Sequence, residues 1–371
     1  MKDIRYHMPV KMLIGQNIIQ RNFQALALGT KCLIVTGKSS AKKSGALDDV
    51  ISALNEQKIE YKIFDEVGQN PYLSVCIRAA EMAVDFGADF IVGIGGGSPL
   101  DAAKAAAVLA ANPGIDASAL FPPSWKNHPL PIALVGTTAG TGSEVTPYAV
   151  VTVDEGHLKK SIFSSQIYPK VIFGDPRYTQ GLSEKFTIST ALDALTHCIE
   201  GYFNAAADPL SDLTAIEGIR LLLDSLKEIK GKKPEEIDLS VRESLYIASL
   251  WGGITIATTG TCFCHALGYF LSESHDVPHG IACAVYLPQY IDRAIKYCPH
   301  RADALFRAVS TSPEEMIAFL DTLYEKPILK LSALSIKEIA GRYPNTKNLL
   351  NSPGQVDLDT AISIMSNLFG E

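Results

Sequence analysis

Four short apolar runs rich in β-branched residues recur along the first half of the chain, and each of the first three is followed by a segment whose apolar positions have helical spacing. The runs fall within residues 31–37, 60–67, 88–100 and 130–144, and the helical patterns within residues 47–57, 74–87 and 101–112. The last two runs lead into polar, glycine-rich loops. Alternating strands and helices predict a parallel sheet covered by helices, and ligands of such sheets bind where the carboxyl ends of the strands lead into loops.

From about residue 183 the runs of strand type disappear, and long helical patterns replace them. Examples are residues 208–229 and 241–257, which are separated by the polar stretch "GKKPEEIDLS". At 371 residues, the chain also exceeds the usual size of one hydrophobic core. The sequence therefore predicts an α/β domain over residues 1–182 and an all-helical domain over residues 183–371.

Composition and charge argue against several classes of protein. Hydrophobic residues make up 47% of the chain and charged residues 20%, which is the balance of a folded globular protein. The net charge of -7 gives no electrostatic reason to bind nucleic acid or an anionic membrane, and no apolar run approaches the ~18 residues of a transmembrane helix. The opening "MKDIRYHMPVK" lacks the apolar core of a signal peptide, and the seven cysteines contain no C-x-x-C pair. We expect a cytoplasmic protein with reduced, mostly buried thiols.

A glycine cluster follows the third apolar run. In "GIGGGSPLDAAK", Gly95, Gly96, Gly97 and Ser98 stand between a predicted strand and a predicted helix. Residues without side chains allow a ligand to approach closely, and the N–H groups at the start of the helix favour an anion such as phosphate. The cluster does not have the G-x-G-x-x-G spacing of the common dinucleotide fingerprint, and a tight turn is the competing interpretation.

A second polar loop, "TTAGTGSE" at residues 137–144, follows the fourth run and strengthens the case for a nucleotide. Its hydroxyls come from Thr137, Thr138, Thr141 and Ser143. Two such loops at one edge of a sheet favour nucleotide binding over simple turns. The first run ends in "VTGKSS" without a carboxylate to hold a ribose 2′-hydroxyl, which favours NADP(H) and also permits NAD(H).

The segment "ALDALTHCIEGYF", residues 191–203, combines an apolar helical stripe with Asp193 and His197 on another face, among small residues. Such a pair is more often a hydrogen bond on a helix than a pair of metal ligands. Two further imidazoles, His265 and His279, stand in segments with few other charges. One carboxylate and three imidazoles suit Fe²⁺ or Zn²⁺ and leave a coordination position for a substrate oxygen.

Other side chains compete for the same role. The nearby competitors are His275, Cys262, Cys264 and Cys283. The cysteines are better interpreted as buried thiols, because C-x-C lacks the usual spacing of a zinc site. His7 and His300 stand in polar contexts and are interpreted as surface residues.

Five linked motifs give the chain a resemblance to a known family. They are "GGGSPLDAAK", "TTAGTGSEVTPYAVV", "FGDPRYT", "STALDALTHCIEGYF" and "HALGYFLSESHDVPHG". In this order and spacing they resemble the iron-containing (group III) alcohol dehydrogenases over nearly the whole chain. The short N-terminus and "VTGKSSAKKSG" are similar to the NADP-using, butanol-dehydrogenase-like branch.

The resemblance implies a nucleotide-binding α/β domain, an all-α C-terminal domain, and a metal ion in the cleft between them. The implied metal ligands are Asp193, His197, His265 and His279. The implied cofactor contacts are Gly37, Ser39, Gly95, Gly96, Gly97, Ser98, Asp101, Thr137, Thr138, Ser143 and Lys159, with Lys160 as the alternative register for the lysine. Many members have a second histidine four positions after the third metal ligand. Here that position is Tyr269, so a proton-relay role for that histidine does not carry over.

The implied activity is reversible hydride transfer between NADP(H) or NAD(H) and a small aldehyde or primary alcohol. The resemblance also implies a homodimer, and the N-terminal strand segment at residues 6–15 is the candidate for its pairing. A reductase of a functionalised aldehyde, such as phosphonoacetaldehyde or sulfoacetaldehyde, is the main alternative. A lyase resembling dehydroquinate synthase and a non-catalytic nucleotide-binding protein are the others. The motifs of such a lyase are not found, and a protein that only bound nucleotide would not need four metal ligands.

Overall fold

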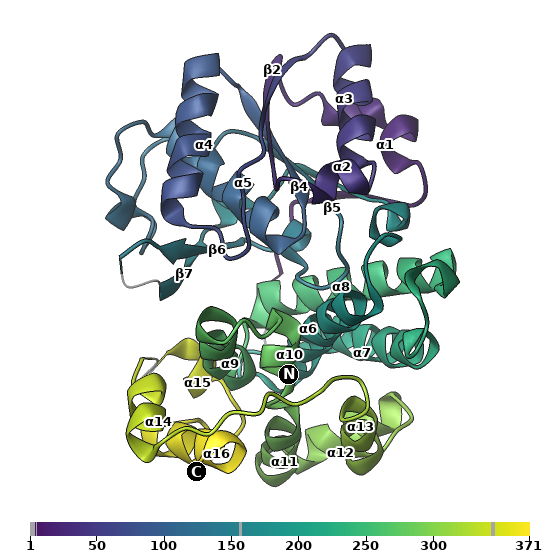
Figure 1. The fold of residues 1–371 in the computed structure, drawn as a ribbon, viewed down its shortest axis with the longest axis vertical. Helices are drawn as coiled ribbons and strands as arrows, with labels where there is room; N and C mark the ends of the chain where they lie inside the picture. The colour runs from purple at the N-terminus through teal and green to yellow at the C-terminus, as the bar shows by residue number, and fades with distance from the viewer. Residues whose placement is uncertain (1–3, 5, 156–157, 343–345) are drawn as a thin grey trace. The chain divides into compact units, whose positions relative to one another are not determined.

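The computed structural model describes residues 4, 6–155, 158–342 and 346–371. The chain divides into two compact units, which Figure 1 shows as ribbons. The sheet unit comprises His7–Leu182 and Lys233–Tyr246, and the helical unit comprises Ser183–Lys232 and Ile247–Glu371 together with the N-terminal residues Ile4 and Tyr6. The segment Lys233–Tyr246 therefore packs with the sheet although it follows two helices of the helical unit.

The sheet unit is built on six parallel strands, and four of them lie in the apolar runs that predicted a parallel sheet. The six strands are β1 (Lys11–Ile14), β2 (Lys31–Thr36), β3 (Glu60–Phe64), β4 (Phe90–Gly95), β5 (Ile132–Gly136) and β8 (Val171–Gly174). Their order across the sheet is β1-β8-β5-β4-β2-β3, and every pair is parallel. The chain order reverses between β2 and β4, and in open α/β sheets the crevice beside such a reversal is the usual ligand site.

Helices cover both faces of this sheet. They are α1 (Ile18–Arg21), α2 (Ser40–Lys43), α3 (Ala46–Glu56), α4 (Leu73–Phe86) and α5 (Gly97–Ala111). Figure 1 shows α4 and α5 on one side of the strands and α1, α2 and α3 on the other. Helix α5 is buried along almost its whole length, because its alanines leave room for close packing on both sides.

A separate antiparallel hairpin follows the glycine-rich loop after β5. It consists of β6 (Tyr148–Val153) and β7 (Leu158–Phe163). The sequence pattern did not predict this hairpin. Its first strand packs against α5, since the Asp101 carboxylate accepts a hydrogen bond of 3.0 Å from the N–H of Val150.

The helical unit agrees with the predicted all-α region. Its helices are α6 (Glu184–Phe203), α7 (Pro209–Ile229), the later part of α8 (Leu239–Thr259), α9 (Phe263–Ser274), α10 (His279–Ala284), α11 (Leu287–Tyr297), α12 (Pro299–Ala308), α13 (Pro313–Leu320), α14 (Ala333–Ala340), α15 (Lys347–Leu350) and α16 (Leu358–Phe369). Helix α6 is buried over most of its length. Glycines allow this: a Cβ at Gly218 would come within 2.5 Å of the Cys198 sulfur, and one at Gly201 within 2.3 Å of Thr255.

All seven cysteines are free thiols, and six of them are buried, as the sequence predicted. Among the described residues, no single helix has the length and apolar character to cross a membrane, although α8 and α9, bent at 114° to each other, pass that test as a pair.

Candidate functional site

Helix α6 carries an acid and an imidazole in a buried position. Ser183 caps the start of the helix, because its side chain accepts a hydrogen bond of 3.2 Å from the N–H of Phe186. Asp193 and His197 follow on one face and are 3% and 5% exposed. Burying a carboxylate costs free energy unless polar partners surround it, so the neighbourhood of Asp193 decides what this face does.

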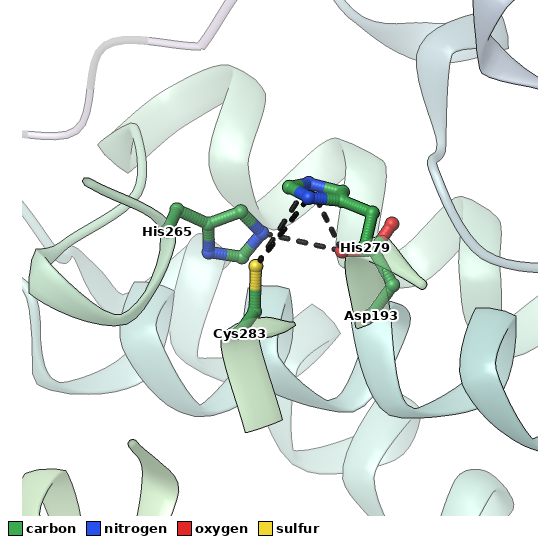
Figure 2. A group of neighbouring side chains, drawn as sticks. All are labelled: Asp193, His265, His279 and Cys283. Carbon is green, nitrogen blue, oxygen red and sulfur yellow. Dashed lines mark hydrogen bonds and ion pairs between the residues drawn. The ribbon is translucent and has the colours of Figure 1, made fainter. Parts of the chain in front are cut away.

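Two further histidines, from α9 and α10, reach the same carboxylate (Figure 2). The Nε2 atom of His265 lies 3.3 Å from Oδ1 of Asp193. The Nε2 atoms of His197 and His279 each lie 3.8 Å from that oxygen. The four side chains predicted as metal ligands therefore gather around one carboxylate oxygen within the helical unit.

The rings pack against one another as well. His197 and His265 stack with their centroids 4.5 Å apart and 12° between their planes. His279 meets His265 edge-on. Tyr269 stacks against the ring of His279, with the ring centroids 5.9 Å apart and 13° between the planes. Tyr269 thus supports a candidate ligand instead of supplying a second imidazole.

Cys283 also belongs to this group, although the sequence favoured its interpretation as a buried thiol. Its sulfur lies 3.8 Å from both ring nitrogens of His279, one helical turn earlier on α10. Ligand atoms of Asp193, His265, His279 and Cys283 all lie within 4.8 Å of one another, a set that could hold a metal ion. The structure therefore offers two candidates, His197 and Cys283, beside the three shared ligands.

The electrostatics of the group suit a cation. Burial alone would raise the pKa of the Asp193 carboxyl, but the surrounding imidazoles of His197, His279 and His265 outweigh burial and lower it. Asp193 is therefore ionised at neutral pH. An ionised carboxylate among imidazole nitrogens is the donor set that Fe²⁺ and Zn²⁺ prefer.

One carboxylate at the site was not singled out from the sequence. Glu200 is fully buried on α6, and its Oε2 lies 2.5 Å from Nδ1 of His265. Its position in "THCIEGYF", seven residues after Asp193, places it on the same side of α6 as Asp193. That spacing was the available signal.

The two glycine-rich loops lie side by side in the sheet unit, as predicted. Thr36 pairs with Ile94, and Gly95 pairs with Gly136, so the loops after β2, β4 and β5 leave the same edge of the sheet. A Cβ on Gly96 would come within 3.1 Å of Thr138, and one on Gly97 within 2.8 Å of Thr141. The glycines of one loop therefore provide the space that the threonines of the other loop occupy.

A buried lysine joins these loops from within α5. Lys104 is fully buried, and its Nζ donates to the backbone oxygens of Ser143, Thr146 and Tyr148 at 2.6, 2.9 and 2.7 Å. Asp101, one turn earlier, accepts a hydrogen bond of 2.7 Å from the hydroxyl of Ser143. The predicted cofactor residues Asp101 and Ser143 thus bond to each other and fix the loop after β5.

The remaining predicted cofactor residues lie at the following places. Thr137 is buried and its N–H donates to the backbone oxygen of Gly95, and the Ser98 hydroxyl accepts from the N–H of Asn70. Gly37 and Ser39 follow the end of β2, with Ser39 exposed. Lys159 lies in β7.

Comparisons with known proteins agree with this arrangement. A family model described as iron-containing alcohol dehydrogenase matches residues 9–176, and a model of the C-terminal part of the Fe-containing alcohol dehydrogenase family matches residues 187–328. The chain is 33% identical to alcohol dehydrogenase 4 of Saccharomyces cerevisiae over 303 residues, which cover 79% of this chain and 77% of the relative.

Two solved structures are similar over almost the full length. The iron-containing alcohol dehydrogenase of Thermotoga maritima has a TM-score of 0.89 at 36% identity, with 98% of this chain and 99% of the other covered. The sulfoacetaldehyde reductase of Bifidobacterium kashiwanohense, solved in complex with NAD⁺, has a TM-score of 0.86 at 26% identity, with 98% of each chain covered.

Proposed function

The chain belongs to the iron-containing alcohol dehydrogenase family, and from this premise we propose that it catalyses reversible hydride transfer between a nicotinamide cofactor and a small aldehyde or primary alcohol. The observation that supports this proposal most directly is the gathering of three imidazoles around the buried, ionised carboxylate of Asp193.

The proposed metal ligands are Asp193, His197, His265 and His279. This donor set fits Fe²⁺ or Zn²⁺, because imidazole and carboxylate suit both ions. When bound, such an ion acts as a Lewis acid that polarises a carbonyl group and stabilises the negative charge developing on its oxygen. The side chain of His279 is 34% exposed while that of Asp193 is 5% exposed, so the group is open on the side of His279.

For the cofactor, we propose that the loops after β2, β4 and β5 hold NADP(H) in preference to NAD(H). The proposed contacts are Gly37, Ser39, Gly95, Gly96, Gly97, Ser98, Asp101, Thr137, Thr138, Ser143 and Lys159. The free N–H groups at the start of α5 favour a pyrophosphate. The stretch after β2 is Gly37, Lys38 and Ser39, and it contains no carboxylate that would repel a 2′-phosphate.

The chain's own residues have separate tasks in this proposal. Glycine backbone lets the cofactor approach the sheet edge closely, and the Asp101–Ser143 hydrogen bond holds the neighbouring loop in place. Tyr269 packs on His279 and fixes the plane of that ring. No side chain is required as a nucleophile, because the hydride is supplied by the reduced nicotinamide.

A screen of NADPH oxidation tests this function. The metal-loaded protein is supplied with uncharged short-chain aldehydes in one set and with phosphonoacetaldehyde and sulfoacetaldehyde in another. Turnover of the uncharged set supports an alcohol dehydrogenase, and turnover of the charged aldehydes alone would assign a functionalised-aldehyde reductase. Net loss of NADPH absorbance also excludes a lyase that recycles its NAD within one cycle.

The variant His279→Ala separates the metal from the cofactor. We expect it to lose bound metal and aldehyde reduction together, while NADPH still binds, because the glycine loops lie in the other unit. An inactive His279→Ala protein with full metal occupancy would contradict the assigned role.

We also propose that the chain forms a homodimer. Strand β1 pairs with β8 on one side only and so lies at an edge of the sheet, with a row of backbone groups available to a second strand. Light scattering on the purified protein checks this, and a monomeric mass at micromolar concentration would contradict it.

A further inference from the structure

Glu200 makes a set of contacts to one metal-ligand candidate that none of the proposed roles uses. Its Oε1 accepts hydrogen bonds from the backbone N–H groups of Cys264 at 2.7 Å and of His265 at 3.4 Å. Its Oε2 lies 2.5 Å from the ring nitrogen Nδ1 of His265. One carboxylate from α6 therefore holds both the backbone and the ring of the same histidine on α9.

The backbone contacts act on the start of α9. Cys264 and His265 are the second and third residues of this helix, whose own N-cap residue, Cys262, makes no side-chain hydrogen bond that caps the helix. The first N–H groups of a helix have no partner within the helix, and an anion beside them is stabilised by the helix dipole. Glu200 thus caps α9 from a neighbouring helix. It fixes the point where α9 begins and, with it, the position of His265.

The ring contact determines which nitrogen of His265 faces Asp193. A carboxylate oxygen that carries no hydrogen can only accept, so the contact between Oε2 of Glu200 and the ring favours the tautomer of His265 that carries its hydrogen on Nδ1. The lone pair then belongs to Nε2, the atom that lies 3.3 Å from Oδ1 of Asp193. Carboxylate partners of this kind orient metal-binding histidines and raise their basicity.

We propose that Glu200 is a positioning residue of the metal site, which sets the tautomer and the orientation of His265 and so tightens metal binding. This inference rests on the proposed metal site and adds a residue to it. The full burial of Glu200 supports the proposal. Burying a carboxylate costs free energy, and the hydrogen bonds to α9 and to His265 offset that cost.

The variant Glu200→Gln tests the proposal with almost no change of volume. Glutamine has only one oxygen, so it can accept either from the backbone N–H groups of α9 or from Nδ1–H of His265, but not from both sides. If the glutamine oxygen caps α9, its side-chain NH₂ group faces the Nδ1–H of a metal-bound His265, and two donors form no hydrogen bond with each other. Either orientation loses one of the two contacts.

Ser352→Ala is the matched control. The Ser352 hydroxyl accepts a hydrogen bond of 3.1 Å from the N–H of Phe263, the first residue of α9, and donates one of 2.7 Å to the backbone oxygen of Asn348. Ser352→Ala therefore removes an acceptor from the start of α9 and leaves the partner of Nδ1 in place, whereas Glu200→Gln disturbs the carboxylate that contacts both.

The measurement is the affinity of the metal-free proteins for Zn²⁺, obtained by competition with a chromophoric chelator. We expect Glu200→Gln to raise the dissociation constant about 10–100-fold, and Ser352→Ala to leave it unchanged. An unchanged affinity in Glu200→Gln, or an equal loss in both variants, would overturn the proposal. Failure of the wild-type protein to bind Zn²⁺ would instead count against the proposed function.

A second readout needs no variant and so does not depend on Glu200→Gln folding. In the zinc-loaded wild-type protein, NMR of histidine labelled with the spin-½ nitrogen isotope reports which ring nitrogen of each histidine binds the ion. We expect coordination through Nε2 of His265 and a slowly exchanging Nδ1–H. Coordination through Nδ1, or rapid exchange of that hydrogen with water, would overturn the proposal.

Discussion

Substitution of Gly280 by alanine should disrupt the metal site without replacing any of the proposed ligand side chains. Gly280 follows His279 at the start of α10, where this short helix packs on α6. A Cβ at this position would lie 1.7 Å from the backbone oxygen of Ser189, 2.7 Å from its carbonyl carbon and 2.9 Å from the N atom of Asp193. The obstacles are backbone atoms of α6, so rotation of a side chain cannot relieve the overlap.

The size of the effect follows from these distances. Ordinary contact begins at 3.4 Å, so α10 and α6 must separate by roughly 1.7 Å at this point. Overpacking of this kind costs about 1–3 kcal/mol of stability. The geometric effect is larger, because ligand distances in a metal site tolerate deviations of only about 0.2 Å and a displacement of 1 Å in an active site lowers the reaction rate about 100-fold. We expect Gly280→Ala to weaken metal binding and to lower the rate of aldehyde reduction by about two orders of magnitude.

Metal content and NADPH binding, measured on the same preparation, test this reasoning. Bound metal and aldehyde reduction should fall together, whereas the affinity for NADPH should stay at the wild-type value. Gly181→Ala is the control, because a Cβ there meets no atom within 4 Å. A Gly280→Ala protein that holds one ion per chain with wild-type affinity would refute the argument that close backbone approach sets the position of His279.

Three further predictions concern the ligand set, the loops and the sheet. Replacement of the metal by Co²⁺ should give no thiolate-to-cobalt charge-transfer band, and a band that disappears in Cys283→Ala would put Cys283 in the place proposed for His197. Lys104→Met should lower the free energy of unfolding by about 3–5 kcal/mol and weaken NADPH binding, since it leaves buried carbonyl oxygens without their cation; an unchanged NADPH affinity would contradict this. Burial acts to raise the pKa of Asp89, but hydrogen bonds from backbone N–H groups at the start of β2 outweigh it and lower that pKa. The stabilisation is therefore present above the unfolded pKa of about 3.9 and lost as the pH falls through the folded pKa, so Asp89→Asn should lower the melting temperature at pH 7 and not at low pH.

Much of the sheet was predictable because buried parallel strands read as apolar, β-branched runs. Strands β2, β3, β4 and β5 lie within the runs expected for them. Strand β1 lies within residues 6–15, the expected N-terminal strand segment, whereas β8 is four residues long, too short for a periodic pattern to distinguish it from a loop. Their place depends on pairing with each other and with β5, which is a tertiary property.

The candidate site was predictable where polar residues interrupt a segment that is otherwise predicted to be buried. Asp193 and His197 stand out as polar side chains in a segment that otherwise reads as buried. Glu200 does not stand out, because a glutamate near the end of a helix is ordinary until α9 is seen to begin against it. Cys283 reads as a small apolar residue, and its closeness to His279 depends on the helical turn that α10 forms.

The central claim is that one divalent ion in the helical unit makes hydride transfer possible. It is tested most directly by an anaerobic titration of the metal-free protein with Fe²⁺, in which bound iron and the rate of NADPH-dependent aldehyde reduction are followed together. We expect no reduction before iron is added and a rate that rises in proportion to bound iron until one ion per chain is reached. Full activity without metal, or a rate that bears no relation to iron bound at this stoichiometry, would contradict it.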